Sequence, residues 1–224
     1  TRDVYDPVNS IAISDDGQYI VAGVNDKSVY LFGRSSSTPL WQDEVDNAAP
    51  VMTVDISADG NYIVAGSKGT NGKIFFYEKA SGSPQWRYSV SDTVTAVSIS
   101  ADGEYIAAGS TNDKVYLFNK DSNTPLWTYE ATDSITAVSI SADGQRIAAG
   151  SDEDVGKVYL FDRTSSSPFW TYGMGEGVLS ISISADGRYV VASNSGGSDF
   201  YKRVYLFDTV EESLLWKYTV GYTS

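Results

Sequence analysis

An Asp-Gly pair occurs five times in the 224-residue chain, at nearly even spacing. The turn glycines Gly17, Gly60, Gly103, Gly144 and Gly187 are separated by 43, 43, 41 and 43 residues. A Trp follows each pair at a similar interval, as Trp41, Trp86, Trp127, Trp170 and Trp216. The segments around each pair also recur, and little of the chain lies outside them. The chain therefore has to fold as five copies of one unit.

Residues Thr95 to Tyr129 show this unit as four short apolar segments separated by turn signals. The first segment ends at the Asp-Gly pair, which favours a hairpin because Gly accepts a positive φ. The fourth opens with a Pro two residues before the Trp, as tolerated on an exposed edge strand. A period of about 40–45 residues with four strands per unit predicts a β-propeller. We expect an all-β, five-bladed β-propeller with four antiparallel strands per blade.

We expect one domain over residues 1–224, with blades at about 1–44, 45–88, 89–130, 131–173 and 174–224. The fifth blade holds all four of its own strands. The ring is therefore expected to close by packing of blade one on blade five, without a mixed terminal blade.

The first strand of each unit alternates large and small residues. In the third unit, Val97 and Ile99 lie on one face, and Ala96 and Ser98 lie on the other. Large faces against small faces suit the close packing of neighbouring blades. The five Trp residues could stack on carbohydrate, as in propeller lectins. Their identical placement in every unit favours a structural wedge between blades instead.

Composition excludes several classes of site. The chain has no Cys and no His, so it cannot form a disulfide, a Cys-His or Ser-His-Asp nucleophilic site, or a His-ligated metal centre. We expect no organic cofactor. The net charge of −13 argues against nucleic acid and against anionic membranes as partners. No segment is suited to direct membrane insertion. The chain begins at Thr1 rather than Met, so we expect a processed or excised product.

Acidic residues recur just before the first strand of four units, and we expect them at the mouth of the central channel. They are Asp6, Asp92, Asp133 and Glu176. Such carboxylates could bind Ca²⁺, which takes six to eight oxygen ligands. Basic residues recur on the same face, just before the third strand, at Lys73, Lys114, Lys157 and Arg203. We favour ion pairing between the two sets, with the calcium site as the alternative.

The loops on this top face differ from blade to blade, whereas the Asp-Gly turns of the opposite face are nearly identical. Variable loops on a rigid scaffold form the default binding surface. The candidate binding residues are Asp26, Lys27, Asn71, Asn112, Asp113, Asp152, Glu153, Asp154 and Tyr201.

The inner half of the unit, V-x-x-I-S-x-D-G-x-Y-I-x-A-G-S, resembles the repeats of WD-repeat-like propellers. The outer half, K-V-Y-L-F-x-(K/R)-x-(S/T)-x-x-P-x-W-x-Y, is similar to quinoprotein-type propeller repeats. The Gly-His and Trp-Asp dipeptides of WD repeats are absent, and quinone ligands cannot be mapped onto the chain. The resemblance implies a propeller fold and leaves the function open.

We expect a non-catalytic scaffold that binds a protein partner or assembles with itself through the variable top-face loops. An extracellular or cell-surface location is favoured over a cytoplasmic one, because the chain is acidic, lacks Cys and His, and does not start with Met. The alternative is a carbohydrate-binding lectin. A glycosidase-type enzyme using paired carboxylates is a further alternative, although the near-identity of the repeats argues against a single asymmetric active site.

Overall fold

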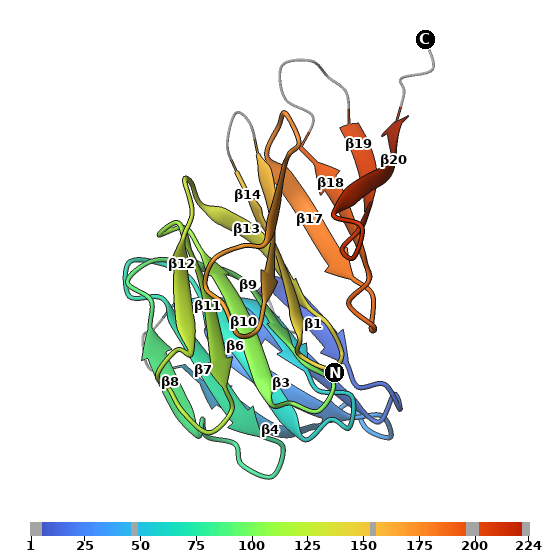
Figure 1. Cartoon of the computed structure of the whole chain (residues 1–224). Coiled ribbons are helices and arrows are strands. Elements are labelled where there is room, and N and C mark those ends of the chain that lie inside the picture. Colours follow the sequence, from blue (N-terminus) through green and yellow to red (C-terminus); the bar gives the residue numbers. More distant parts are fainter. Residues whose placement is uncertain (1–5, 46–48, 153–155, 196–201, 221–224) are drawn as a thin grey trace.

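The computed structural model describes residues 6–45, 49–152, 156–195 and 202–220 (Figure 1). These residues form twenty strands in five antiparallel four-stranded sheets. The strands of each sheet follow in chain order, so every connection within a sheet is a hairpin. The expected all-β, five-bladed propeller fold is confirmed.

The first sheet, blade one, comprises β1 (Val8–Ile13), β2 (Tyr19–Val24), β3 (Ser28–Gly33) and β4 (Pro39–Glu44). Blade two comprises β5 (Val51–Ile56), β6 (Tyr62–Ser67), β7 (Lys73–Glu78) and β8 (Trp86–Ser89). Blade three comprises β9 (Val94–Ile99), β10 (Tyr105–Ser110), β11 (Lys114–Asn119) and β12 (Trp127–Glu130). Blade four comprises β13 (Ile135–Ile140), β14 (Arg146–Ser151), β15 (Lys157–Asp162) and β16 (Trp170–Gly173). Blade five comprises β17 (Val178–Ile183), β18 (Tyr189–Asn194), β19 (Lys202–Asp208) and β20 (Ser213–Val220).

The hairpin between the first two strands of each blade is closed by side chains as well as by the backbone. Gly17 adopts a φ of 65°. The Ser14 hydroxyl donates to Asp16 Oδ1 at 2.6 Å, and the Gln18 amide donates to the same oxygen at 2.9 Å. Ser14 Oγ in turn accepts from the Tyr19 amide at 3.1 Å. The same three bonds recur at the turns that follow Ser57, Ser100, Ser141 and Ser184. The uniformity of the Asp-Gly turns is therefore structural.

Acidification is expected to weaken these turns. Hydrogen bonds from Ser14 and the Gln18 amide lower the pKa of Asp16, and hydrogen bonds from Ser184 and the Arg188 amide lower the pKa of Asp186. A folded pKa below the unfolded value of about 3.9 stabilises the protein above that pH, and this stability is lost as the pH falls through the folded pKa. We expect the melting temperature, followed by circular dichroism, to fall steeply below about pH 4. Ser14→Ala with Ser184→Ala should flatten this acid limb, whereas an unchanged slope would contradict the assignment.

The hydrophobic core lies between the blades. Four clusters of buried residues each combine one blade with the next, from blades one and two to blades four and five. In each cluster the Trp-bearing face of one blade packs on the face of the next blade that carries its large first-strand residues. Between blades one and two, for example, Val21, Leu31 and Trp41 meet Val54 and Ile56. The alternation of large and small residues thus serves blade stacking, as the sequence predicted.

The expected closure of the ring is not observed. The inner strands pack in the order β1, β5, β9, β13, β17, but no strand of blade five packs extensively on a strand of blade one within the described residues. Figure 1 shows blade one and blade five as two separate sheets. Within the described residues, no strand is shared between blade one and blade five. The described part of the chain forms an open arc, in which no described blade covers one face of blade one or one face of blade five.

Candidate functional site: the end faces and the blade contacts that define them

The acidic residues expected at the channel mouth are not gathered into a metal site. Asp92 Oδ1 accepts from the Thr93 amide at 2.7 Å, and Asp133 Oδ1 accepts from the Ser134 amide at 2.6 Å. Asp6 is exposed and Glu176 is half-buried. Across the described residues, no group of three or more Asp, Glu, His or Cys side chains is arranged to hold a metal ion. Asp92 and Asp133 each hold the backbone of the loop that carries them.

Several predicted binding residues of the top face are engaged in loop structure. Asp26 accepts from the Ser28 amide at 3.0 Å and from the Tyr30 hydroxyl at 2.5 Å. Asn112 Nδ2 donates to the Val90 carbonyl and to the Tyr116 hydroxyl, both at 2.7 Å. These contacts fix the loops.

The other predicted binding residues are dispersed. Lys27 and Asp113 occupy equivalent turn positions with φ of 73° and 67°. Asn71 and Asp152 are exposed in the loops of blades two and four. Glu153, Asp154 and Tyr201 lie outside the described residues. The described members of the set are spread over four blades.

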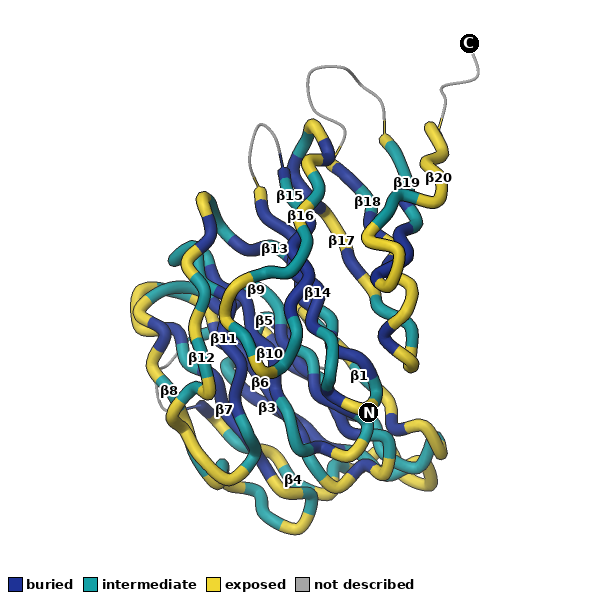
Figure 2. Tube along the Cα trace, in the orientation of Figure 1, coloured by how far each residue is buried: buried dark blue, intermediate teal, exposed yellow. Residues whose placement is uncertain are grey.

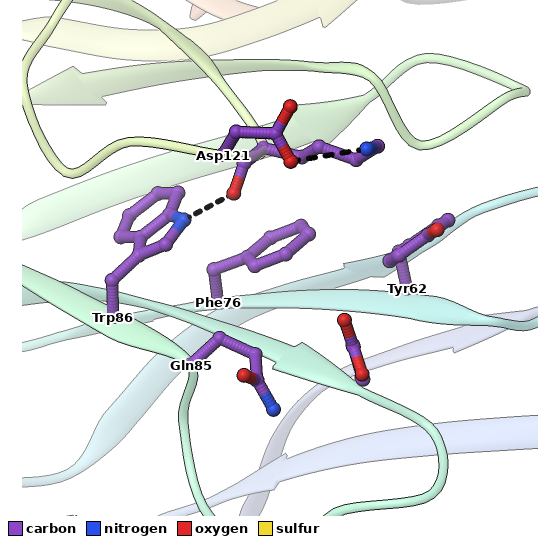
Figure 3. A pocket seen from close by; sticks show the side chains of 7 residues that line it. Tyr62, Phe76, Gln85, Trp86 and Asp121 are labelled. Carbon is purple, nitrogen blue, oxygen red and sulfur yellow. Dashed lines mark hydrogen bonds and ion pairs between the residues drawn. The ribbon is translucent and has the colours of Figure 1, made fainter.

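The Trp residues lock neighbouring blades together. Trp86 Nε1 donates to the Lys120 carbonyl of the next blade at 2.6 Å, and the Lys120 ammonium lies 5.8 Å from the Tyr62 ring centroid. Figure 3 shows Trp86, Phe76 and Tyr62 in a row beneath this segment, where they line a cavity of about 260 Å³. Trp86 stacks on Phe76 with ring centroids 5.2 Å apart. We call this combination of Trp, Tyr and a basic residue the latch.

The latch occurs at the first three blade interfaces. Trp41 donates to the Lys79 carbonyl at 2.8 Å, and Lys79 lies over the Tyr19 ring at 4.2 Å. Trp127 donates to the Arg163 carbonyl at 2.8 Å. The Arg163 guanidinium lies over the Tyr105 ring at 4.3 Å. These contacts support the structural interpretation of the Trp residues over carbohydrate stacking at those positions.

A second set of contacts joins the blades along the axis. Side-chain oxygens of one first strand accept hydrogen bonds from backbone amides of the next first strand. The bonds are Ser10 from Val54 at 3.1 Å, Thr53 from Val97 at 3.2 Å, Asp55 from Ile99 at 2.9 Å, Ser98 from Ile140 at 3.3 Å and Ser139 from Ile183 at 3.2 Å. We call these contacts the axial seam.

Asp55 is the acidic member of the axial seam. Its Oδ2 accepts from the Ile99 amide, and its Oδ1 accepts from its own neighbour, the Ile56 amide, at 2.9 Å. Burial raises the pKa of this carboxyl group, although the two amides oppose the shift. The equivalent residue of blade one is Ala12, which has no acceptor for Ile56. Asp55 therefore accepts the hydrogen bond from the Ile56 amide that Ala12, at the axial-seam position of blade one, cannot accept.

Blade one presents a free face with the composition of a blade interface. Ile11 and Ile13 are 71% and 61% exposed, whereas their equivalents Val54 and Ile56 in blade two are 6% and 7% exposed. A groove of about 620 Å³ runs over this face, lined by Ile13, Ile20, Phe32, Arg34 and the turns beside them. The groove is mostly apolar, and it lies where every other blade receives its neighbour.

Blade five presents the opposite free face. Trp216 and Tyr218 are 49% and 65% exposed, and Figure 2 shows β20 exposed along much of its length. Ser180, Ser182 and Val191 are also exposed. A hollow of about 220 Å³ is lined by residues that include Ser182, Tyr189 and Val191. Arg188 of the same blade lies 5.2 Å from the Tyr189 ring centroid. No described blade covers this face, whereas the next blade covers each of its counterparts in blades one to four.

The comparisons with known proteins place the chain in a family. Residues 25–221 match the family described as "Outer membrane protein assembly factor BamB". The chain belongs to this family. Residues 3–32 also match the family described as "WD domain, G-beta repeat". The resemblance to WD-repeat-like and quinoprotein-type propeller repeats is thereby confirmed. No curated protein matches the chain. Among the described residues, no helix has the length and apolar character needed to cross a membrane.

The sequence reasoning did not identify the end faces as a site. The sequence does mark these faces as apolar blade faces, because the repeat positions of Ile11, Ile13, Trp216 and Tyr218 are those of interface residues in the other blades. What the pattern could not provide was the angle between blades, which decides whether the two ends meet.

Proposed function

We propose that this member of the BamB family is a non-catalytic protein-binding scaffold, and that the faces of blades one and five that no described blade covers take part in binding. The observation that carries the proposal is the exposure of these two blade faces. Blade faces of the same two kinds are buried against each other at every internal blade interface. Large exposed apolar patches on a protein surface mark sites of interaction. Protein interaction is also common among propeller repeat families of these types.

A non-catalytic role is supported by the use of the polar groups. Turn carboxylates such as Asp16 and Asp59 accept hydrogen bonds that hold hairpins, and Asp55 holds two blades together. Groups committed in this way are poorly placed to act as a general acid or base on a substrate. Carbohydrate binding and binding at the top-face loops stay predictions of the sequence.

We propose that the chain works outside the cytoplasm, at or near the cell surface. The family is described by its role in outer membrane protein assembly. The negative charge and the absence of Cys agree with this location. Calcium is not part of the proposed function, since the loop carboxylates Asp92 and Asp133 bond to backbone amides.

Photo-crosslinking tests the proposed surfaces. A photoreactive residue is placed at Ile13 on blade one, at Trp216 on blade five, or at Thr128, an exposed residue of β12 away from both ends. We expect crosslinked protein adducts in an extract of the source cells from the first two positions, and far less from Thr128. Equal yields from all three positions would contradict binding at the end faces. Mass spectrometry of each adduct tells a second copy of the chain from a different protein.

A further inference from the structure

We infer that the outer hairpins of blades one to four are sites of O-linked glycosylation, at the hydroxyl group that stands just before a Pro. These hairpins join the third strand of a blade to its fourth strand. Each contains one Ser-Pro or Thr-Pro pair, and the acceptor residues are Thr38, Ser83, Thr124 and Ser167. The modification goes beyond the protein-binding function proposed above and does not depend on it.

Each outer hairpin carries two hydroxyl residues two positions apart, and the fold uses only the first of them. The first hydroxyl oxygen accepts from the backbone amide two residues later, which closes the turn. These acceptors are Ser36, Ser81, Ser122 and Ser165, at 3.0, 3.3, 3.0 and 3.1 Å. Across the described residues, by contrast, no hydrogen bond involves the side-chain hydroxyl of Thr38, Ser83, Thr124 or Ser167.

The hydroxyl group is kept at this second position in all four blades, although the fold makes no use of it. The positions around it differ from blade to blade. The residues just before it are Ser37, Gly82, Asn123 and Ser166, and those two positions after it are Leu40, Gln85, Leu126 and Phe169. The acceptor itself is Thr in two blades and Ser in the other two, so the hydroxyl is the group they share. The retained parts are the hydroxyl and the Pro, which together form a recognition element for a modifying enzyme.

The four acceptors are accessible in the folded protein, because all of them are exposed. Ser83, Thr124 and Ser167 belong to blades that pack on a described blade on each side. Their exposure is therefore independent of what covers blades one and five. The following Pro also restricts each acceptor to an extended backbone. An extended polar segment on an exposed hairpin can enter the cleft of an enzyme without unfolding of the blade.

A neutral sugar suits these hairpins better than a phosphoryl group. A phosphate is stabilised by a Lys or Arg that is free to pair with it. The basic residues of these hairpins are already used, because Lys79 and Arg163 lie over aromatic rings of the latch and Lys120 forms ion pairs with two carboxylates. Phosphates would also add to the net charge of −13. Segments rich in Ser and Thr that contain Pro are typical of O-glycosylated proteins.

The modification is a glycosyl transfer from an activated donor, in which the anomeric carbon of the sugar is bonded to a phosphate oxygen of a nucleotide or a lipid. A separate transferase catalyses it. The side-chain oxygen of the Ser or Thr forms a bond to the anomeric carbon, and the bond from that carbon to the phosphate oxygen breaks. The phosphate leaves with the electron pair of the broken bond, and the hydroxyl proton passes to a base of the transferase.

Blade five provides an internal control. Ser213 stands at the acceptor position of its outer hairpin, but Leu214 replaces the Pro. Ser213 is half-buried and lies within β20, where it pairs with Asp208 of β19. Because it lacks both the Pro and the exposure of the other four residues, we expect no sugar at Ser213.

Mass spectrometry of the full chain purified from its source cells tests the inference, with fragmentation by electron transfer to locate each modified residue. We expect the mass increment of one or more sugar residues at Thr38, Ser83, Thr124 and Ser167. We expect none at the turn-closing serines or at Ser213. An unmodified chain, or sugar on the turn-closing serines as well, would overturn the inference. A phosphoryl increment at the four acceptors would also overturn it, because the group transferred would then be charged.

Three variants of the blade-three hairpin, produced in the source cells, test the parts played by the hydroxyl and the Pro. Thr124→Val removes the acceptor and should abolish the sugar on this hairpin. Pro125→Leu copies blade five and should lose the sugar at Thr124, although the hydroxyl remains. Ser122→Ala is the matched control, since it removes the turn-closing hydroxyl and should keep the sugar at Thr124.

Circular dichroism and the melting temperature check that each of these variants folds. Full modification of Thr124 in the Pro125→Leu variant would contradict recognition of the Ser/Thr-Pro pair. Sugar that persists on the hairpin of Thr124→Val, or that is lost from a folded Ser122→Ala variant, would contradict the assignment of the acceptor.

Discussion

Replacing Trp127 by alanine is expected to lower the free energy of unfolding by about 3 kcal/mol, whereas the same change at Trp216 should lower it by less than about 1 kcal/mol. The two residues hold the same position in the repeat. Trp127 donates to the Arg163 carbonyl of the next blade and packs 5.3 Å from the Phe161 ring, centroid to centroid. No described blade covers Trp216, which is half exposed. The difference therefore isolates the contribution of the blade interface from that of the residue type.

The measurement is equilibrium unfolding in urea, with both changes made singly in the wild-type chain at the same low protein concentration. The m-value should be the same for the two variants, because they expose similar surface on unfolding. Comparable losses at Trp127 and Trp216 would mean that blade five is covered within one chain and that the ring is closed.

The repeat predicted the number of blades, the four strands in each and the places of the turns. This succeeded because each element is defined locally. Gly17 and its equivalents fix the hairpins, and the alternation in residues such as Val97 and Ser98 fixes which side of a strand faces which neighbour. The identical placement of the Trp residues in every unit led to the expectation that they pack between blades, which Trp41, Trp86 and Trp127 confirm.

Closure could not be predicted in the same way, because it depends on the angle between blades. That angle is set by the combined size of side chains such as Phe75 and Tyr77 in one face and Leu31 in the other. A small error in each angle is multiplied along the series of blades. The sequence of blade five contains a full set of four strands and a Trp at the usual position, Trp216. It is therefore compatible with both a closed and an open ring.

The candidate top-face site could be predicted only as a set of loops. Sequence spacing located Asp26, Asn112 and Asp92, but it could not show that their oxygen and nitrogen atoms are used within and between loops. Short polar side chains near a turn commonly bond to the local backbone. Variation among loops is therefore compatible with different structural solutions as well as with ligand recognition.

Replacing Asp55 by serine is expected to destabilise the protein by about 1–3 kcal/mol, the cost of a buried amide left without an acceptor. Serine at this position can still accept from the Ile99 amide, as Ser98 accepts from Ile140. It cannot also accept from the Ile56 amide, which donates to Asp55 Oδ1 in the wild-type protein. The loss should be seen as a lower urea midpoint at an unchanged m-value.

Adding Ala12→Ser should recover most of that loss. A serine at position 12 lies where Ser98 and Ser139 lie in their blades, and can accept from the Ile56 amide of the next blade. Ala12→Ser alone should change stability little, because Asp55 already satisfies that amide. The double-mutant cycle should therefore show a coupling free energy of about 1 kcal/mol or more. Additive effects would mean that water satisfies Ile56 in the single variant. Coupling would show that the acidic residue on the axis compensates for an alanine in the preceding blade.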